Sequence, residues 1–98
     1  MAERLIRRFV VRGRVQGVGF RWFVEREANQ IGVAGWVKNN EDSTVELVAA
    51  GEAEQLGRLR ARLEAGPRAS RVDRVDEAEA RVEDLNGSET FFEIQGAW

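Results

Sequence analysis

The sequence predicts an α+β fold in which two helices pack on one face of a mostly antiparallel sheet. Short segments in which apolar and polar residues alternate, such as Arg7–Gly13, indicate strands with one buried face. Two longer segments repeat their apolar residues at intervals of three and four, which is typical of helices with one buried face. The run Asn40-Glu41-Asp42-Ser43 is rich in turn-forming residues and predicts a hairpin between two of the strands.

These patterns place the individual elements along the chain. In the first strand Phe9 and Val11 share one face, and in the second helix the apolar stripe contains three leucines, at 56, 59 and 63. Gly32 is expected to end the first helix, and Gly66-Pro67 lies beyond the end of the second. In chain order we expect a strand at Arg7–Gly13, a loop at Arg14–Phe20, a helix at Arg21–Gln30, strands at Val33–Asn39 and Thr44–Ala50, a helix at Glu52–Leu63 and a strand at Thr90–Gln95.

The segment Arg71–Leu85 allows two interpretations. Its apolar residues fit helical spacing, and its content of alanine and glutamate favours a helix. The charged run Val72–Asp76 also suits the edge of a sheet, where charged residues are common. Periodicity does not decide between the two. If Arg71–Ala80 is a strand, the element order becomes βαββαβ.

The composition excludes several classes of function. The 98 residues are 43% hydrophobic and 33% charged, enough for one small core, so we expect a single domain over residues 1–98. The chain has no cysteine, which excludes disulfides, thiolate catalysis and cysteine-ligated metals. It also has no histidine, which excludes the Ser-His-Asp triad, an imidazole general base and most transition-metal sites. We expect neither a metal nor a cofactor.

The charge distribution bears on partners and location. A net charge of −2 argues against a dedicated nucleic-acid or anionic-membrane binder. No segment is apolar enough to cross a bilayer, and no export signal is visible, so we expect a cytoplasmic protein without membrane contact. The first 26 residues nevertheless hold seven arginines against two glutamates, or three when Glu27 is included, a net charge of about +4 to +5. This basic end is suited to attracting an anion.

The loop Arg14–Phe20 is a candidate phosphate site. A glycine-rich loop before a helix can direct its backbone amides, together with the helix N-terminus, at one anion. The sequence departs from both common nucleotide motifs, because Phe20-Arg21 follows Gly19 and Trp22 stands where the dinucleotide motif needs glycine. The two glycines alone are more often a structural turn. Arg21 strengthens the case, since a guanidinium where the loop becomes the helix can bind two phosphate oxygens at once.

Two motifs in the chain resemble those of a known family. Gly13-Arg14-Val15-Gln16-Gly17-Val18-Gly19-Phe20-Arg21 resembles the phosphate-loop motif of the acylphosphatases. The family's second motif is similar to Gly35-Trp36-Val37-Lys38-Asn39 followed by Asp42, Val45, Glu46 and Gly51, and a terminal Phe92-x-Ile94 strand also matches. The resemblance covers essentially the whole chain. It implies the ferredoxin-like βαββαβ sandwich, and therefore a strand at Arg71–Ala80.

The resemblance also implies an activity, the metal-independent hydrolysis of a small-molecule acyl phosphate to a carboxylate and inorganic phosphate. We expect the protein to be a monomer. By this resemblance Arg21 is the phosphate-binding arginine and Asn39 positions the attacking water. The resemblance assigns the phosphate cradle to the backbone amides of Gln16, Gly17, Val18, Gly19 and Phe20. Such chemistry depends mostly on positioning and charge stabilisation, which a guanidinium and oriented amides can provide without Mg²⁺.

Two other functions are compatible with parts of the sequence. A non-catalytic anion-binding or regulatory module would use the same pocket, although the cysteine-rich segments that follow such domains in hydrogenase maturation enzymes are missing here. An RNA-binding sheet of the same topology would need exposed aromatic residues on its central strands, and Val45–Ala49 has none. The chain departs from the family pattern at Ser43, where glycine is usual, and in its C-terminal extension Gly96-Ala97-Trp98.

Overall fold

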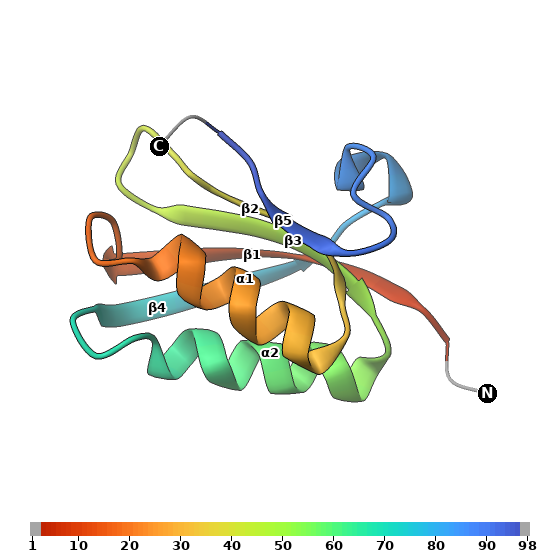
Figure 1. Cartoon of the computed structure of the whole chain (residues 1–98), viewed down its shortest axis with the longest axis horizontal. Coiled ribbons are helices and arrows are strands. Elements are labelled where there is room, and N and C mark those ends of the chain that lie inside the picture. The colour runs from red at the N-terminus through yellow and green to blue at the C-terminus, as the bar shows by residue number, and fades with distance from the viewer. Residues whose placement is uncertain (1–2, 97–98) are drawn as a thin grey trace.

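The computed structural model describes residues 3–96 as two layers, with two helices covering one face of a five-stranded sheet (Figure 1). Ala97 and Trp98, part of the C-terminal extension, lie outside the described residues. In chain order the elements are β1 (Leu5–Arg14), α1 (Phe20–Ile31), β2 (Ala34–Asn39), β3 (Val45–Gly51), α2 (Ala53–Ala65), β4 (Arg71–Glu79), the 3₁₀ helix η1 (Val82–Leu85) and β5 (Phe92–Ile94).

The strand order β4-β1-β3-β2-β5 results from two interleaved crossovers. The chain passes from β1 through α1 to β2 and leaves a gap, which β3 fills by pairing antiparallel to both strands. From β3 it passes through α2 to β4, which pairs antiparallel to β1 at the edge of the sheet. Among the strand pairings of residues 3–96, only the short pairing of β5 with β2 is parallel. This confirms the predicted βαββαβ sandwich, with β5 as a short added strand.

The main core lies between the helices and the sheet. Both sides of this core follow the predicted periodicity. Every second residue of β1 and β3 points towards the helices, and residues three and four apart on α1 and α2 point towards the sheet. The side chains predicted to share buried faces are almost completely buried, namely Phe9, Val11, Leu56, Leu59 and Leu63. Val45, Leu47, Ala49 and Phe92 are buried in the same core. Burial of this apolar surface is the main free-energy term that holds the two layers together.

A second, smaller core covers part of the opposite face of the sheet. It contains Trp36, Val48, Ala50 and Leu85. Leu85 comes from η1, and the Trp36 indole donates a hydrogen bond of 2.7 Å from Nε1 to the backbone carbonyl of Asp84 in the same helix. The sequence did not predict η1. It explains the ambiguity of Arg71–Leu85, because the helical spacing combined residues of β4 with residues of η1, which are two separate elements.

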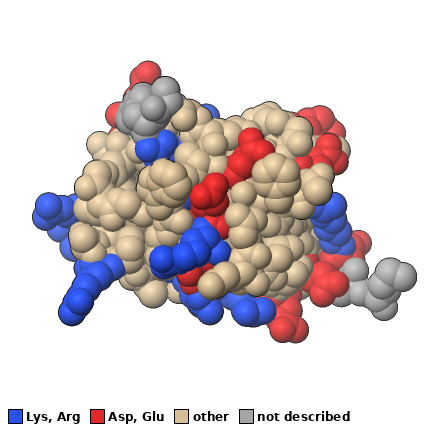
Figure 2. Space-filling view, viewed as in Figure 1, with Lys and Arg blue, Asp and Glu red and all other residues tan. Residues whose placement is uncertain are grey.

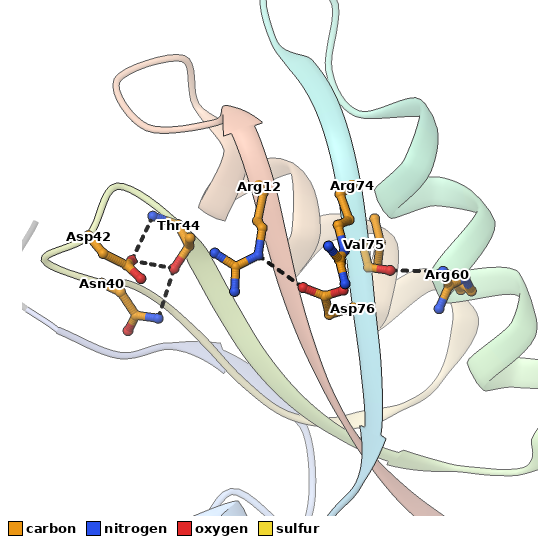
Figure 3. Close-up of polar contacts among 8 residues, drawn as sticks. All are labelled: Arg12, Asn40, Asp42, Thr44, Arg60, Arg74, Val75 and Asp76. Atoms are coloured by element: carbon orange, nitrogen blue, oxygen red, sulfur yellow. Dashed lines mark hydrogen bonds and ion pairs between the residues drawn. The ribbon is translucent and has the colours of Figure 1, made fainter.

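Strand β4 is an edge strand, and its charged side chains form ion pairs on β1 and α2. Arg12 on β1 contacts Asp76 at 2.9 Å, and the pKa of that carboxyl is lowered, mainly by this hydrogen bond (Figure 3). Arg60 on α2 donates to the backbone carbonyl of Val75 at 2.9 Å and to the Glu77 carboxylate at 2.8 Å. Charged side chains are common on edge strands, because they limit edge-to-edge aggregation with other chains.

Most boundaries of the elements differ from the predicted ones by one or two residues. Helix α2 continues to Ala65, two residues beyond the predicted end, and stops where Gly66 takes a φ of 66°. Strand β5 is shorter than the predicted Thr90–Gln95, because Phe91 lies outside the ladder with 60% of its surface exposed. Within residues 3–96, no helix has the length and apolar character required to span a membrane.

Candidate functional site

The loop between β1 and α1 depends on two glycines with left-handed backbone conformations. Gly17 has a φ of 74° and Gly19 a φ of 78°. A Cβ atom built on either residue would meet no other atom within 4 Å, so conformation, rather than lack of space, requires glycine at both positions. Left-handed residues in such a loop bring successive backbone N–H groups to one side, which creates a concave site for an anion.

Helix α1 begins directly after this loop. Gly19 occupies the N-cap position without a side-chain hydrogen bond, and the first turn contains no acidic residue. The first N–H groups of the helix therefore have no capping side chain, and the helix dipole places about half a positive charge at this end. Arg21, the second residue of the helix, adds a full positive charge to the same place.

A cavity of about 230 Å³ opens between the loop, the start of α1 and the end of β2. It is lined by Val15, Gly17, Gly19, Phe20, Arg21, Trp22 and Asn39. The structure thus brings together residues that the sequence places in two separate motifs, 18 positions apart between Arg21 and Asn39. Gln16 and Val18, the other two residues assigned to the cradle, do not line it with their side chains. Val18 instead packs against the main core.

Arg21 is half-buried beside this cavity. Among residues 3–96, no carboxylate lies close enough to its guanidinium to form an ion pair. Most arginines of the sheet differ from Arg21 in this respect, since Arg8, for example, pairs with Glu46 and Asp84. The charge of Arg21 is therefore available to an anion that enters the cavity.

Asn39 is held at the start of a hydrogen-bonded turn. It is the last residue of β2, and its side-chain oxygen is buried. In the turn that follows, Asn40 donates to the Thr44 hydroxyl at 3.0 Å, and the Thr44 hydroxyl donates to Asp42 at 2.6 Å (Figure 3). Hydrogen bonds from the hydroxyl and the backbone amide of Thr44 lower the pKa of Asp42. This network fixes the hairpin that carries Asn39.

Ser43 takes the left-handed conformation in this turn, with a φ of 76°. The prediction that serine occupies a position suited to glycine is confirmed. The left-handed conformation costs a non-glycine residue about 1 kcal/mol. The hairpin nevertheless closes, with Asn40 donating from its backbone amide to the carbonyl of Thr44 at 2.9 Å.

The side chain of Gln16 joins the loop to the hairpin. Its Nε2 donates to the backbone carbonyl of Asn40 at 2.8 Å and to that of Thr44 at 2.9 Å. In the sequence, only the backbone amide of Gln16 was expected to have a role. The side-chain contact was missed because it joins positions 24 and 28 residues apart. It couples the part of the cavity that holds Arg21 to the part that holds Asn39.

Trp22 was also missed as a cavity residue. The sequence analysis used it only to exclude the dinucleotide motif. A signal was present, because Trp22 lies outside the apolar stripe of α1, and 70% of its surface is exposed in the structure. Trp36, by contrast, is buried in the second core.

The charge of the surface agrees with an anion site at this end of the molecule. Figure 2 shows Lys and Arg side chains projecting from the left end of the face, where Figure 1 places the loop before α1. Acidic side chains in the same view gather towards the centre and the right. Basic surfaces of this kind attract anions over several ångströms in water. In the described part of the chain, no group of three or more carboxylates is placed to hold a metal ion.

A larger cavity, of about 420 Å³, lies at the other end of α1, about 18 Å away along the helix axis. It is lined by Arg4, Gly32, Ala34, Ala50, Gly51, Glu52, Gln55, Glu89 and Thr90. Its lining includes one arginine and two glutamates, and the arginine donates to the backbone carbonyl of Glu89 at 3.0 Å. The excess of carboxylates disfavours a phosphate, so the smaller cavity is the better anion site.

Comparison with known proteins agrees with the motifs over almost the whole chain. The Acylphosphatase family model matches residues 7–94. The acylphosphatase of Koribacter versatilis (strain Ellin345) is 52% identical over 92 residues, which cover 94% of this chain and 81% of that protein. The crystal structure of acylphosphatase from Bacillus subtilis has 40% identity and a TM-score of 0.84, covering 94% of this chain and 99% of that one. The structure of an acylphosphatase from Coxiella burnetii has 36% identity and a TM-score of 0.85, covering 94% and 93%.

Proposed function

The chain belongs to the acylphosphatase family, and we propose that it hydrolyses acyl phosphates with Arg21 and the loop amides holding the phosphate and Asn39 positioning water. The single observation that carries this assignment of roles is the shared cavity. Arg21, the two loop glycines and Asn39 line the same space, although they come from two motifs that are separated in the sequence.

The phosphate site combines three kinds of positive potential. The amides of Gln16, Gly17, Val18, Gly19 and Phe20 provide hydrogen-bond donors, the N-terminus of α1 provides its dipole, and Arg21 provides a full charge. The Arg21 guanidinium has no carboxylate partner among residues 3–96, so binding a phosphate replaces water and breaks no ion pair. These donors are fixed before substrate arrives, which lets them stabilise the charge that spreads over the phosphoryl oxygens during transfer.

Asn39 is suited to orienting a water molecule. Its carboxamide offers an oxygen that accepts a hydrogen bond and a nitrogen that donates one, but it cannot take up a proton. In the proposed reaction the water oxygen forms a bond to phosphorus as the bond from phosphorus to the acyl oxygen breaks. The carboxylate leaves with that electron pair. The proton released by water passes to a phosphoryl oxygen of the substrate, so the products are a carboxylate and inorganic phosphate.

This route explains how a chain without histidine can catalyse the reaction. A carboxylate is a good leaving group, so no general acid is needed to protonate it. The substrate's own phosphate accepts the proton, so no side-chain base is needed either. What the protein must provide is position and charge stabilisation, and the loop and hairpin provide both.

The roles are tested by measuring phosphate release from benzoyl phosphate in the presence of EDTA. We expect Arg21→Ala and Asn39→Ala each to lower kcat/KM by at least about a hundredfold, because losing one transition-state donor typically has that effect. Arg58→Ala is the matched control, since Arg58 lies exposed on α2 and away from the cavity. Circular dichroism should show that all three variants fold. Near-normal rates in either site variant would overturn its assignment.

The same measurement separates an enzyme from a binding module that uses the same cavity. Wild-type protein that binds inorganic phosphate but releases none from acetyl or benzoyl phosphate would be an anion-binding module. We expect the enzyme to act as a monomer, because one chain supplies both motifs that line the cavity. We also expect it to act in the cytoplasm. A molecular mass of about twice 11.1 kDa in solution would contradict the monomer.

A further inference from the structure

Trp22 is the most exposed of the large apolar side chains in the described part of the chain. Seventy per cent of its surface faces solvent, compared with 60% for Phe91 and 50% for Val82. Of these three, only Trp22 lines the cavity that holds Arg21 and Asn39. Burying a large aromatic side chain is favourable, so a tryptophan that stays exposed beside a polar cavity indicates a role in binding.

The position of Trp22 on α1 places it at the rim of the cavity. It is the third residue of the helix, directly after Arg21, and it both lines the cavity and faces solvent. A phosphate held by the loop amides and Arg21 must therefore direct its acyl group outwards, past this rim. The cavity has a volume of about 230 Å³, several times the roughly 30 Å³ that one water molecule takes in the liquid. It therefore has room for part of the acyl group beside the phosphate.

The faces of the Trp22 indole are available for stacking. Three other aromatic rings, those of Phe20, Phe23 and Trp36, already have such partners. The Arg26 guanidinium lies 5.9 Å from the centre of the Phe23 ring, Phe23 also packs against Phe20, and Lys38 lies over Trp36. Among residues 3–96, Trp22 has neither a ring partner nor a cation over its face.

We propose that the Trp22 indole is the docking face for the acyl group, and that it makes the enzyme favour acyl phosphates whose acyl group is aromatic or otherwise flat and apolar. This inference rests on the proposed function, because it takes the phosphate to be bound at Arg21. An aromatic acyl group can stack on the indole in an offset or edge-to-face arrangement. An acetyl group is too small to cover it. A stacked aromatic pair of this kind raises the binding affinity roughly threefold to tenfold.

Steady-state kinetics with two substrates test the inference. For benzoyl phosphate, Trp22→Ala should raise KM about threefold to tenfold and leave kcat within about twofold. For acetyl phosphate, both constants should stay as in the wild type. Trp22→Phe should restore most of the benzoyl phosphate KM. Phe91→Ala is the matched control, because it removes another exposed aromatic side chain outside the cavity and should change the kinetic constants of neither substrate.

Two results would overturn the inference while leaving the proposed function in place. One is a KM for benzoyl phosphate that is unchanged in Trp22→Ala. The other is an equal change for both substrates, which would show a general effect on the loop. Competitive inhibition of the wild type gives an independent test, in which phenylphosphonate should bind more tightly than methylphosphonate, and equal inhibition would also overturn it. Absence of turnover of either substrate by the wild type would contradict the proposed function itself.

Discussion

The hydrogen bonds of Gln16 predict a variant that damages catalysis without removing any group from the phosphate site. Gln16→Met keeps the length of the side chain but removes the donor that binds the carbonyls of Asn40 and Thr44. The backbone amide of residue 16 stays in the loop. Because the side chain is the link between loop and hairpin, we expect the hairpin to shift relative to Arg21 and to carry Asn39 with it.

The expected loss of stability follows from the two contacts, at 2.8 and 2.9 Å. Each hydrogen bond contributes about 0.5–1.5 kcal/mol. Both carbonyls keep a backbone donor, since Ser43 donates to Asn40 and Asn40 donates to Thr44, so neither acceptor is left without a partner. The free energy of unfolding should therefore fall by about 1–2 kcal/mol, near the lower end of the range for two bonds.

The expected effect on activity is larger than the effect on binding. A shift of about 1 Å in a positioning group can lower the rate about a hundredfold. We expect Gln16→Met to lower kcat tenfold to a hundredfold on this ground, with KM within about threefold, because the phosphate donors all lie in the loop and at the start of α1 rather than in the hairpin. Steady-state kinetics with benzoyl phosphate and urea unfolding measure the two effects on the same preparation.

Gln55 provides a matched control at the opposite end of α1. Its side chain also makes two hydrogen bonds to backbone groups, accepting from Glu52 at 2.8 Å and donating to Ile31 at 3.2 Å. Gln55→Met should therefore lose a similar amount of stability and keep its kcat. If Gln16→Met loses stability and retains wild-type kcat, the Gln16 side chain is a structural link only, and the positioning role is refuted.

Two further predictions concern the hairpin. The lowered pKa of Asp42 means that its hydrogen bonds from Thr44 add stability above the ordinary pKa of a carboxyl, and that this contribution is lost as the pH falls through the lowered value. In urea unfolding, wild type should therefore exceed Asp42→Asn in stability at about pH 6 and lose that advantage towards about pH 3; an equal difference at both pH values would argue against it. Ser43→Gly should raise the free energy of unfolding by up to about 1 kcal/mol, since glycine relieves the left-handed strain at some cost in unfolded-state entropy. A less stable Ser43→Gly variant would show that the serine side chain contributes more than its backbone strain costs.

Much of the fold could be predicted because the signals are local. The alternation in β1 and the three-and-four spacing of α1 and α2 are properties of short segments, and the glycines that end both helices have positive φ angles. Strand β4 could not be assigned by periodicity. Most of its side chains are exposed, so it lacks a clear apolar face, and the neighbouring η1 added apolar residues at helical spacing. The resemblance to a family identified it, because it supplied the topology.

In the candidate site, too, the residues in local motifs could be predicted and those that act through distant contacts could not. Arg21, Asn39 and the loop glycines were predicted from motifs, and the structure places them around one cavity. Their catalytic roles remain a proposal. The side chains of Gln16 and Trp22 were not predicted, because the first acts through contacts between distant segments, and the second depends on which face of α1 meets the cavity.

The most direct test of the central claim, that one phosphate is bound between the loop and Arg21, is an NMR titration of the ¹⁵N-labelled protein with inorganic phosphate. We expect the amide resonances of Gln16–Phe20 to shift with one common dissociation constant, along with the side-chain amide of Asn39. Shifts confined to Gly32, Gly51 and Gln55, which line the larger cavity at the other end of α1, would contradict the account.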